Sequence, residues 1–551
     1  MFRRLLIANR GEIAVRIART CHELGVEVVA VHSDVDAEAR HARAADQVVH
    51  LPGVTPPETY LNVGAILAAA SKSGADAIHP GYGFLSERAD AASAVISAGL
   101  AWIGPPPDAI LAAGDKIRAR RLAEAVGVAP VPGTSEPVRA AADALAFGQA
   151  HGYPIAVKAA GGGGGRGLKV AESADEVAAA MESAVREAEA YFGSGDVYLE
   201  RYLTTPKHIE IQVLAPRPGG AMSLGARDCS LQRRHQKLIE ETPPPRHADI
   251  VPAMGEAALA VAGACGYVNA GTVEFLVDDD GRFYFLEINA RLQVEHTITE
   301  EVLGLDLVAA QLRIAAGDDL GFGPQDLRPH GHAIECRINA EDPARGFMPG
   351  PGRIERFREP TGPGIRLDSG YGQGDEVPSA YDSLLAKLVA WGATRDEARD
   401  RMLGALREFD ITGVPTTIPA HLVMLENPEF VQGTYTTRTV EGGALASLTV
   451  LGPASATEMT ARLWHPAVSS WVRRRGESSS DRGTIVAPMH GTILKVLVSV
   501  GDRIDAGEPV AVLEAMKMET YVASATSGVV QKIDVQAGEV VEAGEVVAVV
   551  G

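Results

Sequence analysis

The chain has 551 residues, with 51 lysines and arginines against 71 aspartates and glutamates, which gives a formal net charge of −20. That length predicts several domains, and the acidic balance argues against nucleic acid or an anionic membrane as a partner. No stretch approaches the run of about 18 apolar residues that marks a membrane-spanning helix. The four cysteines form no C-x-x-C pair, so we expect neither a disulfide framework nor a zinc site.

The first hundred residues alternate short apolar segments with amphipathic ones, which predicts a doubly wound parallel sheet. The expected elements are strand 5–8, helix 13–24 and strands 27–31, 75–78 and 100–103. No G-x-G-x-x-G follows the first strand, so a dinucleotide site is not predicted there. The apolar start of the chain is too short for a signal peptide, and we therefore expect a cytoplasmic protein.

From about residue 130 the pattern changes to a helix, a strand over 153–160, a glycine loop, a second strand, a long helix and a strand ending at Tyr202. Strand-rich sequence continues to about residue 290. A third region, at about 330–445, mixes strands with a helix over 395–409. Residues 473–483 have the composition of a polar linker.

The last part of the chain contains an internal repeat. Three glycines recur with a shift of 37 residues: Gly491, Gly501 and Gly507 return as Gly528, Gly538 and Gly544. Two copies of one strand-turn-strand unit predict a small pseudo-symmetric β-domain with one sheet for each copy. Lys517 lies between two methionines at the hairpin that joins the copies. A lone lysine on a turn is usually only solubilising, but its place at the centre of the repeat favours a specific role.

The glycine loop, residues 161–167, follows a strand in which Ile155, Val157 and Ala159 alternate with Lys158. Read alone, such a loop is typical of a flexible linker. Between two strands, however, glycines let backbone N–H groups approach phosphate oxygens closely, and Lys158 is placed to contact the same phosphates.

Two acidic residues, Glu274 and Glu287, lie on strands flanking an Asp-Asp-Asp-Gly turn. A two- or four-residue loop pairs residues whose numbers sum to 559, so Glu274 is expected opposite Phe285 and diagonal to Glu287, at about 7–8 Å. Asn289 continues the same face. Two carboxylates and an amide suit a hard cation such as Mg²⁺. The alternative is a pair of solvated strand carboxylates.

Several segments together resemble the ATP-grasp fold of biotin carboxylase over residues 1–450. They are IANRGEIAVRI, AIHPGYGFLSE, GDK at 114–116, KAAGGGGGRG, DCSLQRRHQK, GTVEFL, FLEINARLQVEH and HAIECRINAED. The half-repeat and its AMKM tetrad resemble the biotin carboxyl carrier family. The whole chain therefore resembles the α subunit of an acyl-CoA carboxylase, of the compact bacterial acetyl-/propionyl-CoA type.

The resemblance implies a fold in four folded parts. These are an α/β doubly wound N-terminal domain (1–113), an ATP-grasp α+β domain (114–325), a mixed α+β third domain (326–450) and, after a connector and linker (451–483), an all-β biotinyl/lipoyl-like sandwich (484–551).

The resemblance also assigns expected site residues. For ATP they are Lys116, Lys158, Gly164, Gly165, Glu200, Arg201, Tyr202, Leu203, His208, Gln232, His235 and Glu274. For the metal they are Glu274, Glu287 and Asn289, and for bicarbonate Lys237, Arg291, Gln293 and Val294. Glu295 matches the general base, Arg337 the residue that holds the enolate of biotin, and Lys517 the biotin attachment site, with Lys237 and Arg291 also counted as catalytic.

The implied reaction is ATP- and bicarbonate-dependent carboxylation of biotin, with ATP, Mg²⁺ or Mn²⁺ and covalent biotin as cofactors. The implied partners are further copies of the chain, a biotin protein ligase and a carboxyltransferase β subunit. The sequence departs from the family at Thr297, where proline is usual, and at Ala290, where threonine or serine is usual. Thr297 could alter how Glu295 is held.

Two other functions remain open at this point. A biotinylated scaffold with an inactive ATP-grasp part is opposed by the intact set Lys116, Lys158, Lys237, Glu274, Glu287, Arg291, Glu295 and Arg337. An ATP-grasp subunit of pyruvate carboxylase would differ only in its partner. The stretch 451–483 is too short for the extra β-barrel domain of many propionyl- and methylcrotonyl-CoA carboxylase α subunits. The final carboxyl acceptor stays undetermined because the partner subunit binds it.

Overall fold

The structure is a computed structural model that describes residues 1–134, 136–160, 168–192, 194–450, 483–487, 491–515, 518–524, 526–541 and 544–551. Gly164, Gly165 and Lys517 lie outside these residues, as does nearly all of the predicted linker. The chain divides into two compact units: Met1–Asn339, Ile354–Asp375 and Leu384–Ser447 form one, and Ala340–Arg353, Glu376–Ser383 and Leu448–Gly551 the other. In the described part, no helix has the length and apolar character needed to cross a membrane.

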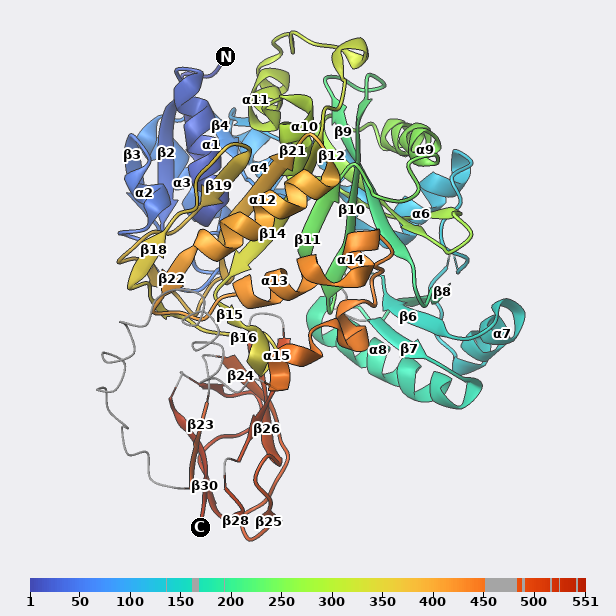
Figure 1. Ribbon diagram of the computed structural model, residues 1–551, viewed down its shortest axis with the longest axis vertical. Coiled ribbons are helices and arrows are strands. Elements are labelled where there is room, and N and C mark those ends of the chain that lie inside the picture. Colours follow the sequence, from blue (N-terminus) through green and yellow to red (C-terminus); the bar gives the residue numbers. More distant parts are fainter. Residues whose placement is uncertain are drawn as a thin grey trace. The chain divides into compact units, whose positions relative to one another are not determined.

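The N-terminal part is a five-stranded parallel sheet in the order β3-β2-β1-β4-β5, as the alternation of strands and helices predicts (Figure 1). Its strands are β1 (Arg4–Ile7), β2 (Glu27–His32), β3 (Gln47–His50), β4 (Ala77–His79) and β5 (Ala101–Trp102). Its helices are α1 (Gly11–Glu23), α2 (Arg40–Arg43), α3 (Val63–Ser73) and α4 (Ala89–Ser97). The edge strand β3 is half exposed and only four residues long, so its sequence carries no clear strand signal.

A smaller antiparallel sheet, in the order β7-β6-β8, carries the glycine-loop region. Its elements are α7 (Ala141–His151), β6 (Ile155–Ala159), β7 (Leu168–Ala171), α8 (Val177–Phe192) and β8 (Val197–Arg201). Ile155, Val157 and Ala159 pack into a core with side chains of α8, while Lys158 lies on the other face. The predicted alternation of β6 is therefore confirmed, and it directs Lys158 away from this core.

The large central sheet is antiparallel, in the order β13-β12-β9-β10-β11-β14-β21-β19. Its strands are β9 (Lys207–Ala215), β10 (Met222–Arg233), β11 (Gln236–Thr242), β12 (Asn269–Val277), β13 (Phe283–Asn289), β14 (His332–Asn339), β19 (Ile365–Ser369) and β21 (Leu384–Gly392). Strand β11 belongs to the expected ATP-grasp domain and β14 to the expected third domain. Because these two strands pair, a single sheet spans the domain boundary that was expected between residues 325 and 326.

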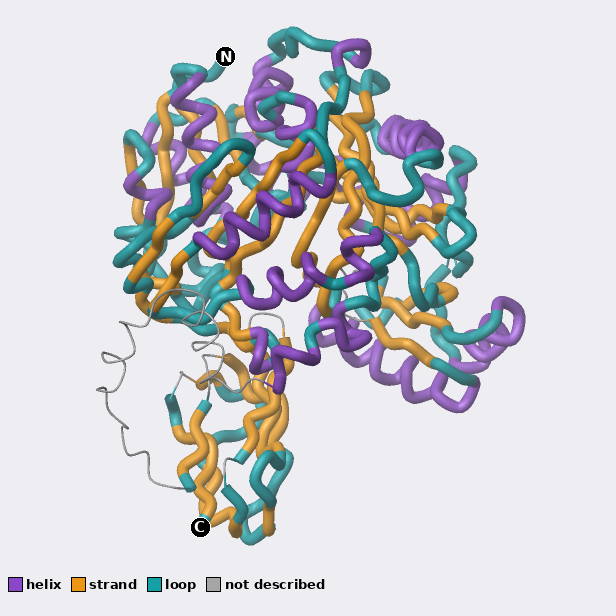
Figure 2. The backbone as a smooth tube through the Cα atoms, in the orientation of Figure 1, coloured by secondary structure: helices purple, strands orange, loops and turns teal. Residues whose placement is uncertain are grey.

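The remaining helices of this unit pack on the sheets or join them (Figure 2). They are α5 (Pro107–Gly114), α6 (Lys116–Ala125), α9 (Val251–Ala264), α10 (His296–Leu303), α11 (Leu307–Ala316), α12 (Arg395–Glu408), α13 (Ile418–Glu426) and α14 (Pro428–Gln432). Helix α12 covers β21 and β14 (Figure 1). The short strands β18 (Arg356–Arg358) and β22 (Asp410–Thr412) pair with each other in a separate two-stranded sheet.

A buried acid, Glu241 of β11, connects the central sheet to the C-terminal helices. Its carboxylate accepts from Arg395 at 2.7 and 2.9 Å and from the Tyr435 hydroxyl at 2.6 Å, and it lies 2.6 Å from His332 Nε2. Although burial raises it, the hydrogen bonds from His332 and Arg395 lower the pKa of Glu241 to about 2 from an ordinary 4.5.

We expect this group to make the protein sensitive to acid. Its pKa is lower in the folded state, so its contribution of about 3 kcal/mol is present above pH 4.5 and is lost as the pH falls toward 2. Urea denaturation between pH 5 and 3 should show a smaller loss of stability with falling pH in Glu241→Gln than in wild type. The exposed Glu256→Gln serves as control, and equal slopes for all three proteins would contradict this role.

The C-terminal residues of the second unit form a sandwich of two four-stranded sheets, β23-β30-β28-β25 and β27-β26-β24-β29. The strands are β23 (Thr484–Val486), β24 (Gly491–Val496), β25 (Arg503–Ile504), β26 (Pro509–Ala515), β27 (Met518–Ala523), β28 (Gly528–Ile533), β29 (Val540–Val541) and β30 (Val546–Val550). The pseudo-symmetric sandwich is confirmed, but the prediction of one sheet for each copy is wrong. Each sheet takes two strands from each copy, because the copies exchange strands to close a common core.

Candidate active site

A row of charged side chains crosses four neighbouring strands of the central sheet. Glu287 of β13 is opposite Glu274 of β12, and Glu274 is opposite Glu210 of β9. Glu210 is in turn opposite Arg227 of β10. Directly opposed side chains share one face of a sheet and have Cβ atoms about 4.5–5.5 Å apart. The strand pairing therefore gathers three carboxylates and one guanidinium on one face.

The register of the β12–β13 hairpin differs from the prediction. Val277 pairs with Phe283 across a five-residue loop, and Leu286 is bulged, so that Glu274 pairs with Glu287 rather than with Phe285. The odd loop length shifts the register by one residue and the bulge shifts it by another, which returns Glu287 to the face of Glu274. The two carboxylates are direct neighbours and not the diagonal pair that was expected.

Lys237 of β11 joins three carboxylates. Its Nζ lies 2.8 Å from Glu210 Oε2, 3.1 Å from Glu274 Oε1 and 2.6 Å from Glu295 Oε1. Glu295 immediately precedes α10 and is fully buried. Burial raises its pKa, but the charges of Lys237, Arg337 and Arg227 outweigh burial and hold the pKa of Glu295 well below its usual range. Glu295 is therefore a carboxylate at neutral pH.

Arg337 of β14 lies between two buried carboxylates. Its Nη2 is 2.9 Å from Glu295 Oε2, and its Nε donates to Glu240 Oε1 of β11 at 2.6 Å. A guanidinium keeps its charge at any physiological pH and presents several donors in a fixed plane. Arg337 can therefore bind Glu295 on one side and still direct other N–H groups elsewhere.

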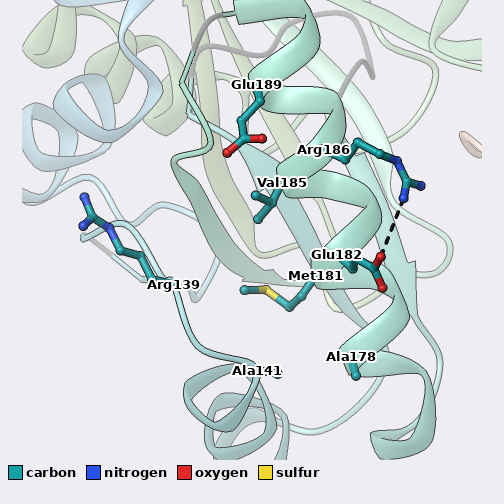
Figure 3. Close-up of a pocket in the computed structure, with 8 residues that line it drawn as sticks. All are labelled: Arg139, Ala141, Ala178, Met181, Glu182, Val185, Arg186 and Glu189. Atoms are coloured by element: carbon teal, nitrogen blue, oxygen red, sulfur yellow. Dashed lines mark ion pairs between the residues drawn. The ribbon is translucent and has the colours of Figure 1, made fainter.

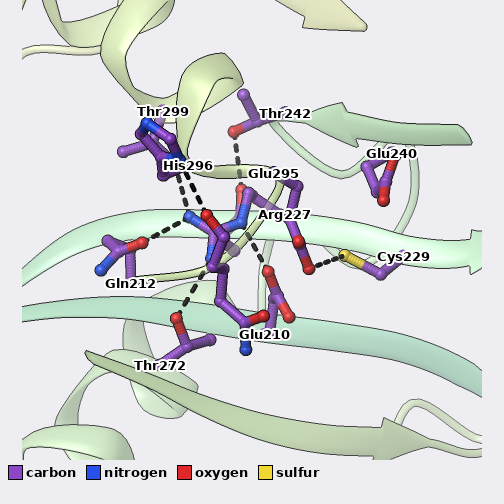
Figure 4. Close-up of polar contacts among 12 residues, drawn as sticks. Glu210, Gln212, Arg227, Cys229, Glu240, Thr242, Thr272, Glu295, His296 and Thr299 are labelled. Carbon is purple, nitrogen blue, oxygen red and sulfur yellow. Dashed lines mark hydrogen bonds and ion pairs between the residues drawn. The ribbon is translucent and has the colours of Figure 1, made fainter. Parts of the chain in front are cut away.

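Arg227 is the cation at the end of the row on β10. It is completely buried, and it donates to Glu210 Oε1 at 2.5 Å, Gln212 Oε1 at 2.7 Å, Thr299 Oγ1 at 2.9 Å and Thr272 Oγ1 at 3.2 Å. Figure 4 shows these partners arranged around the guanidinium. Breaking a buried, fully bonded ion pair is costly, so Arg227 fixes Glu210 and through it Lys237.

The segment after β13 adds an amide and a further cation. Arg291 donates to Gln293 Oε1 at 2.8 Å and to Asn289 Oδ1 at 3.1 Å, and its Nε lies 3.2 Å from Glu87 Oε1. Asn289 Nδ2 donates to Glu274 Oε1 at 2.8 Å. The carbonyl of Val294 accepts from the buried Lys387 at 3.0 Å. The four residues expected to bind bicarbonate thus lie beside the row of carboxylates.

The described residues expected to contact ATP phosphates border the same row. Lys116, the first residue of α6, forms an ion pair with Glu287, and Lys158 forms one with Glu200 of β8. His208 Nε2 lies 3.0 Å from Glu274 Oε2. Arg120 Nη1 also binds Glu200, at 2.9 Å. Helix α6 therefore forms ion pairs with both sheets, through Arg120 with Glu200 of the glycine-loop sheet and through Lys116 with Glu287 of the central sheet.

His235 occupies the two-residue turn between β10 and β11, where Arg233 pairs with Gln236. Arg234 and His235 both have left-handed backbone conformations, with φ of 46° and 65°. Such a turn normally takes Asn or Gly, and each non-glycine residue held there costs of order 1–3 kcal/mol. Burial and the charge of Lys158 lower the pKa of His235, so that the imidazole is neutral near Lys158.

The other residues expected at the nucleotide lie along the hinge after β8 and on β10. Arg201 N donates to Pro132 O at 2.7 Å and Tyr202 N to Pro154 O at 3.0 Å, while Leu203 is partly buried beside them in sequence. Gln232 is buried and pairs with Lys237. Gly164, Gly165 and Lys517 lie outside the described residues.

The oxygen-rich end of the row fits a magnesium ion. Glu274 and Glu287 are opposed carboxylates, and the Asn289 side chain is hydrogen-bonded to Glu274. Mg²⁺ prefers a few oxygen ligands from the protein together with substrate phosphates. The fit rests on the chemical type of the ligand atoms, which are oxygens of two carboxylates and one amide. Lys116 and Lys158, which are expected to bind the ATP phosphates, lie beside them.

Four buried charged residues at the site were not among those predicted from the sequence: Glu210, Arg227, Glu240 and Lys387. A signal for Glu210 exists in β9, where His208, Glu210 and Gln212 alternate with isoleucines in a strand that is buried throughout. Polar residues with period two inside a buried strand indicate a polar face that faces other protein groups. Arg227 and Lys387 carry no such local signal.

The two departures from the family occupy different surroundings. Ala290 is buried and apolar. The Thr297 hydroxyl donates to Glu335 of β14, not to Glu295. The Thr297 side chain therefore contacts Glu335, the residue two positions before Arg337 on β14, and does not hold Glu295 by a hydrogen bond.

A separate groove lies between the start of α7 and α8 (Figure 3). It is lined by Arg139, Ala141, Ala178, Met181, Glu182, Val185, Arg186 and Glu189. None of these residues belongs to the charged row or to the residues expected to bind the nucleotide.

Four family descriptions match the chain in succession. Residues 1–110 match "Biotin carboxylase, N-terminal domain", 115–322 match "Carbamoyl-phosphate synthase L chain, ATP binding domain", 335–442 match "Biotin carboxylase C-terminal domain" and 483–550 match "Biotin-requiring enzyme". The biotin carboxylase parts and the carrier part are therefore both present in one chain.

Individual proteins agree with this division. The chain is 44% identical to the biotin-dependent acyl-coenzyme A carboxylase alpha3 subunit of Mycobacterium leprae, over 96% of this chain and 95% of that protein. It is 47% identical to a biotin carboxylase of Nostoc sp., over 80% of this chain and 99% of that protein. Among solved structures it resembles the biotin carboxylase domain dimer of Hydrogenobacter thermophilus 2-oxoglutarate carboxylase, in complex with MgADP, ADP and bicarbonate, with a TM-score of 0.78 and 43% identity over 80% of this chain and 98% of that one.

Proposed function

The chain belongs to the family of biotin-dependent acyl-CoA carboxylase α subunits, in which a biotin carboxylase is fused to a biotin carrier, and from this premise we propose how its residues divide the work and which acceptor it serves. It is an ATP-dependent ligase that carboxylates biotin. The proposed biotin attachment site is Lys517, and the proposed final acceptor is an acyl-CoA, acetyl- or propionyl-CoA, bound by a separate carboxyltransferase β subunit.

Glu295 is the proposed general base for bicarbonate. A carboxylate held by Lys237 at 2.6 Å and by Arg337 at 2.9 Å is ionised but only weakly basic. A bicarbonate ion placed between Lys237 and Arg291 would also bind the Lys237 ammonium. Lys237 would then stabilise the Glu295 carboxylate less, and Glu295 would become a stronger base. Glu295 then takes the bicarbonate proton as a bicarbonate oxygen attacks the γ-phosphorus of ATP, and ADP leaves.

Phosphoryl transfer depends mainly on placing the reactants in line and neutralising charge. Lys116, Lys158 and His235 are the proposed contacts to the phosphates, and Gly164 and Gly165 the backbone donors. Mg²⁺ held by Glu274, Glu287 and Asn289 would supply positive charge across the phosphate oxygens. The product, carboxyphosphate, breaks down to CO₂ and phosphate next to the acceptor.

Arg337 is the proposed cation that binds biotin, the group that accepts CO₂. A bound biotin would supply the ureido nitrogen that becomes carboxylated, its proton passing to the phosphate released from carboxyphosphate, and Arg337 would hold the ureido oxygen on which negative charge develops. The guanidinium already balances Glu295 and Glu240, and it has further N–H groups to offer that oxygen. The observation that carries this proposal is the convergence of Lys237, Arg337 and a buried, ionised Glu295.

The final acceptor, which takes the carboxyl group from carboxybiotin, can be identified directly with the complete complex. The biotinylated chain is co-purified with its carboxyltransferase partner, then given MgATP, labelled bicarbonate and either acetyl-CoA, propionyl-CoA or pyruvate. We expect label in an acyl-CoA product and none in oxaloacetate. Added avidin should stop the transfer, since it sequesters biotin. Transfer to pyruvate alone would assign the chain to pyruvate carboxylase instead.

A further inference from the structure

Two buried acids, Glu240 and Glu335, lie next to Arg337. Glu240 of β11 and Glu335 of β14 are direct partners in the strand pairing, and both are fully buried. Residues so opposed point to the same face of the sheet, and Arg337, two residues after Glu335, shares that face. Two carboxylates and one guanidinium therefore form a compact group next to Glu295.

Each of the two acids has one bonded and one unbonded oxygen. Glu240 Oε1 accepts from Arg337, while Glu335 Oε2 accepts from the Thr297 hydroxyl. Glu240 Oε2 and Glu335 Oε1 are buried and have no hydrogen-bond donor among the described residues. A buried anionic oxygen without a donor is strongly unfavourable, whereas a proton between two facing carboxyls supplies a donor to one and removes a charge from the pair.

The surrounding charges do not compensate two anions. The ionisable groups that act on the pair from neighbouring elements are Arg337, Lys387, Lys237, Glu295, Cys229 and Cys336. Lys237 is bound to Glu210, Glu274 and Glu295, and Lys387 lies 3.2 Å from Glu12. Burial raises the pKa of both thiols well above the usual range, so they stay neutral. Among the described cations, Arg337 alone contacts the pair, and it is shared with Glu295.

We propose that Glu240 and Glu335 share one proton, and that Glu240, as a positioning residue, holds the Arg337 guanidinium against Glu295. This inference rests on the proposed role of Arg337 in binding the carboxyl acceptor. With one shared proton, the pair carries a single negative charge. This charge binds the Arg337 guanidinium but leaves it able to bind Glu295 as well. Loss of that proton would add a second charge and pull the guanidinium away from Glu295 and the acceptor.

The acid–base properties of the two groups agree with this arrangement. Burial, together with the like charge of Glu335, raises the pKa of Glu240 to about 8 against the opposing charge of Arg337. Burial raises the pKa of Glu335 to about 7 against the charges of Lys387 and Arg337. Thr297, one of the two departures from the family, lowers the pKa of Glu335 through its hydrogen bond.

The shared proton can be observed by infrared spectroscopy of the full-length protein labelled with ¹³C-glutamate. At neutral pH, wild type should show a protonated carboxyl signal that Glu335→Gln lacks, because Glu240 alone beside Arg337 ionises. The exposed Glu256→Gln should keep the signal. Thr297→Val, which removes the hydroxyl donor, should move the disappearance of the signal to higher pH. A wild-type spectrum that differs from that of Glu335→Gln only by an ionised carboxylate would overturn the proposal, as would an unshifted titration in Thr297→Val.

The positioning role has its own kinetic signature with free biotin as acceptor. Glu240→Gln should lower kcat/KM for biotin about 10- to 100-fold while the KM for ATP stays unchanged, since a misplaced guanidinium affects only the acceptor. In wild type, kcat/KM for biotin should fall as the pair loses its last proton at alkaline pH, and this fall should be absent in Glu240→Gln. If Glu240→Gln changed the KM for ATP as much as the kcat/KM for biotin, or if it kept the alkaline fall of wild type, the positioning role would be refuted. A wild-type chain unable to carboxylate biotin would refute the proposed function, yet the infrared titration would still decide whether the proton is shared.

Discussion

Glu295→Gln is expected to lower bicarbonate-dependent ATP cleavage by a factor of about 10²–10⁴, the usual loss when a general base is removed. Glutamine keeps the shape of the side chain but cannot accept the bicarbonate proton. It also leaves Lys237 and Arg337 without the anion that both contact at present. The measurement is the rate of ADP release with and without bicarbonate at saturating ATP.

Biotin incorporation provides the control for this variant, because attachment takes place on the carrier domain. We expect Glu295→Gln to carry as much biotin as wild type, judged by intact mass. A variant that retains near-normal bicarbonate-dependent ATP cleavage would show that Glu295 is not the base.

Lys517→Arg is expected to abolish biotin attachment completely while leaving carboxylation of free biotin within about twofold of wild type. Arginine keeps the positive charge, but a guanidinium does not form the amide that a lysine amine forms with biotin. The described residues that are expected to bind ATP lie in the other compact unit, which has hydrophobic cores of its own. The measurements are intact mass for attached biotin and label transfer from bicarbonate for the activity on free biotin.

A matched substitution on the same domain distinguishes attachment from folding. Lys495→Arg changes a lysine of β24 in the same way and should be biotinylated normally. If Lys517→Arg also abolished carboxylation of free biotin, the division into a catalytic and a carrier module would be wrong.

The buried charges of the central sheet come at the expense of stability. Arg227, Glu210 and Glu295 are completely buried, and a buried ion pair often stabilises a protein less than apolar residues of the same size. Their position around one site is consistent with a demand for fixed charges, since preorganised groups in a site of low dielectric stabilise developing charge more than solvated ones do. The strained turn at His235 fits the same interpretation.

Much of the fold could be predicted from periodicity alone. The alternation of Ile155, Val157 and Ala159 with Lys158 identified both the strand and the side on which the lysine lies. The apolar runs at 5–8 and 28–31 corresponded to short parallel strands of the first sheet, which lies between helices. The 37-residue repeat identified the pseudo-symmetry of the sandwich.

What could not be predicted depends on contacts between distant segments. Nothing local in the sequence shows that Leu286 is bulged or that the hairpin loop has an odd length, and these two features decide which residue Glu274 faces. The sandwich exchanges strands between its copies because a single copy cannot close a core by itself. Glu240 and Glu335 are far apart in the sequence, and only the pairing of β11 with β14 brings them together.

We propose that one chain carboxylates the biotin on its own carrier domain. Purified, fully biotinylated protein is incubated with MgATP and labelled bicarbonate, and the label is located by peptide mapping under mild conditions. We expect acid-labile label on the peptide that contains Lys517, dependent on ATP and absent from Glu295→Gln. Biotin on that peptide without label, in wild type given ATP and bicarbonate, would contradict self-carboxylation and favour a carrier whose ATP-grasp part is inactive.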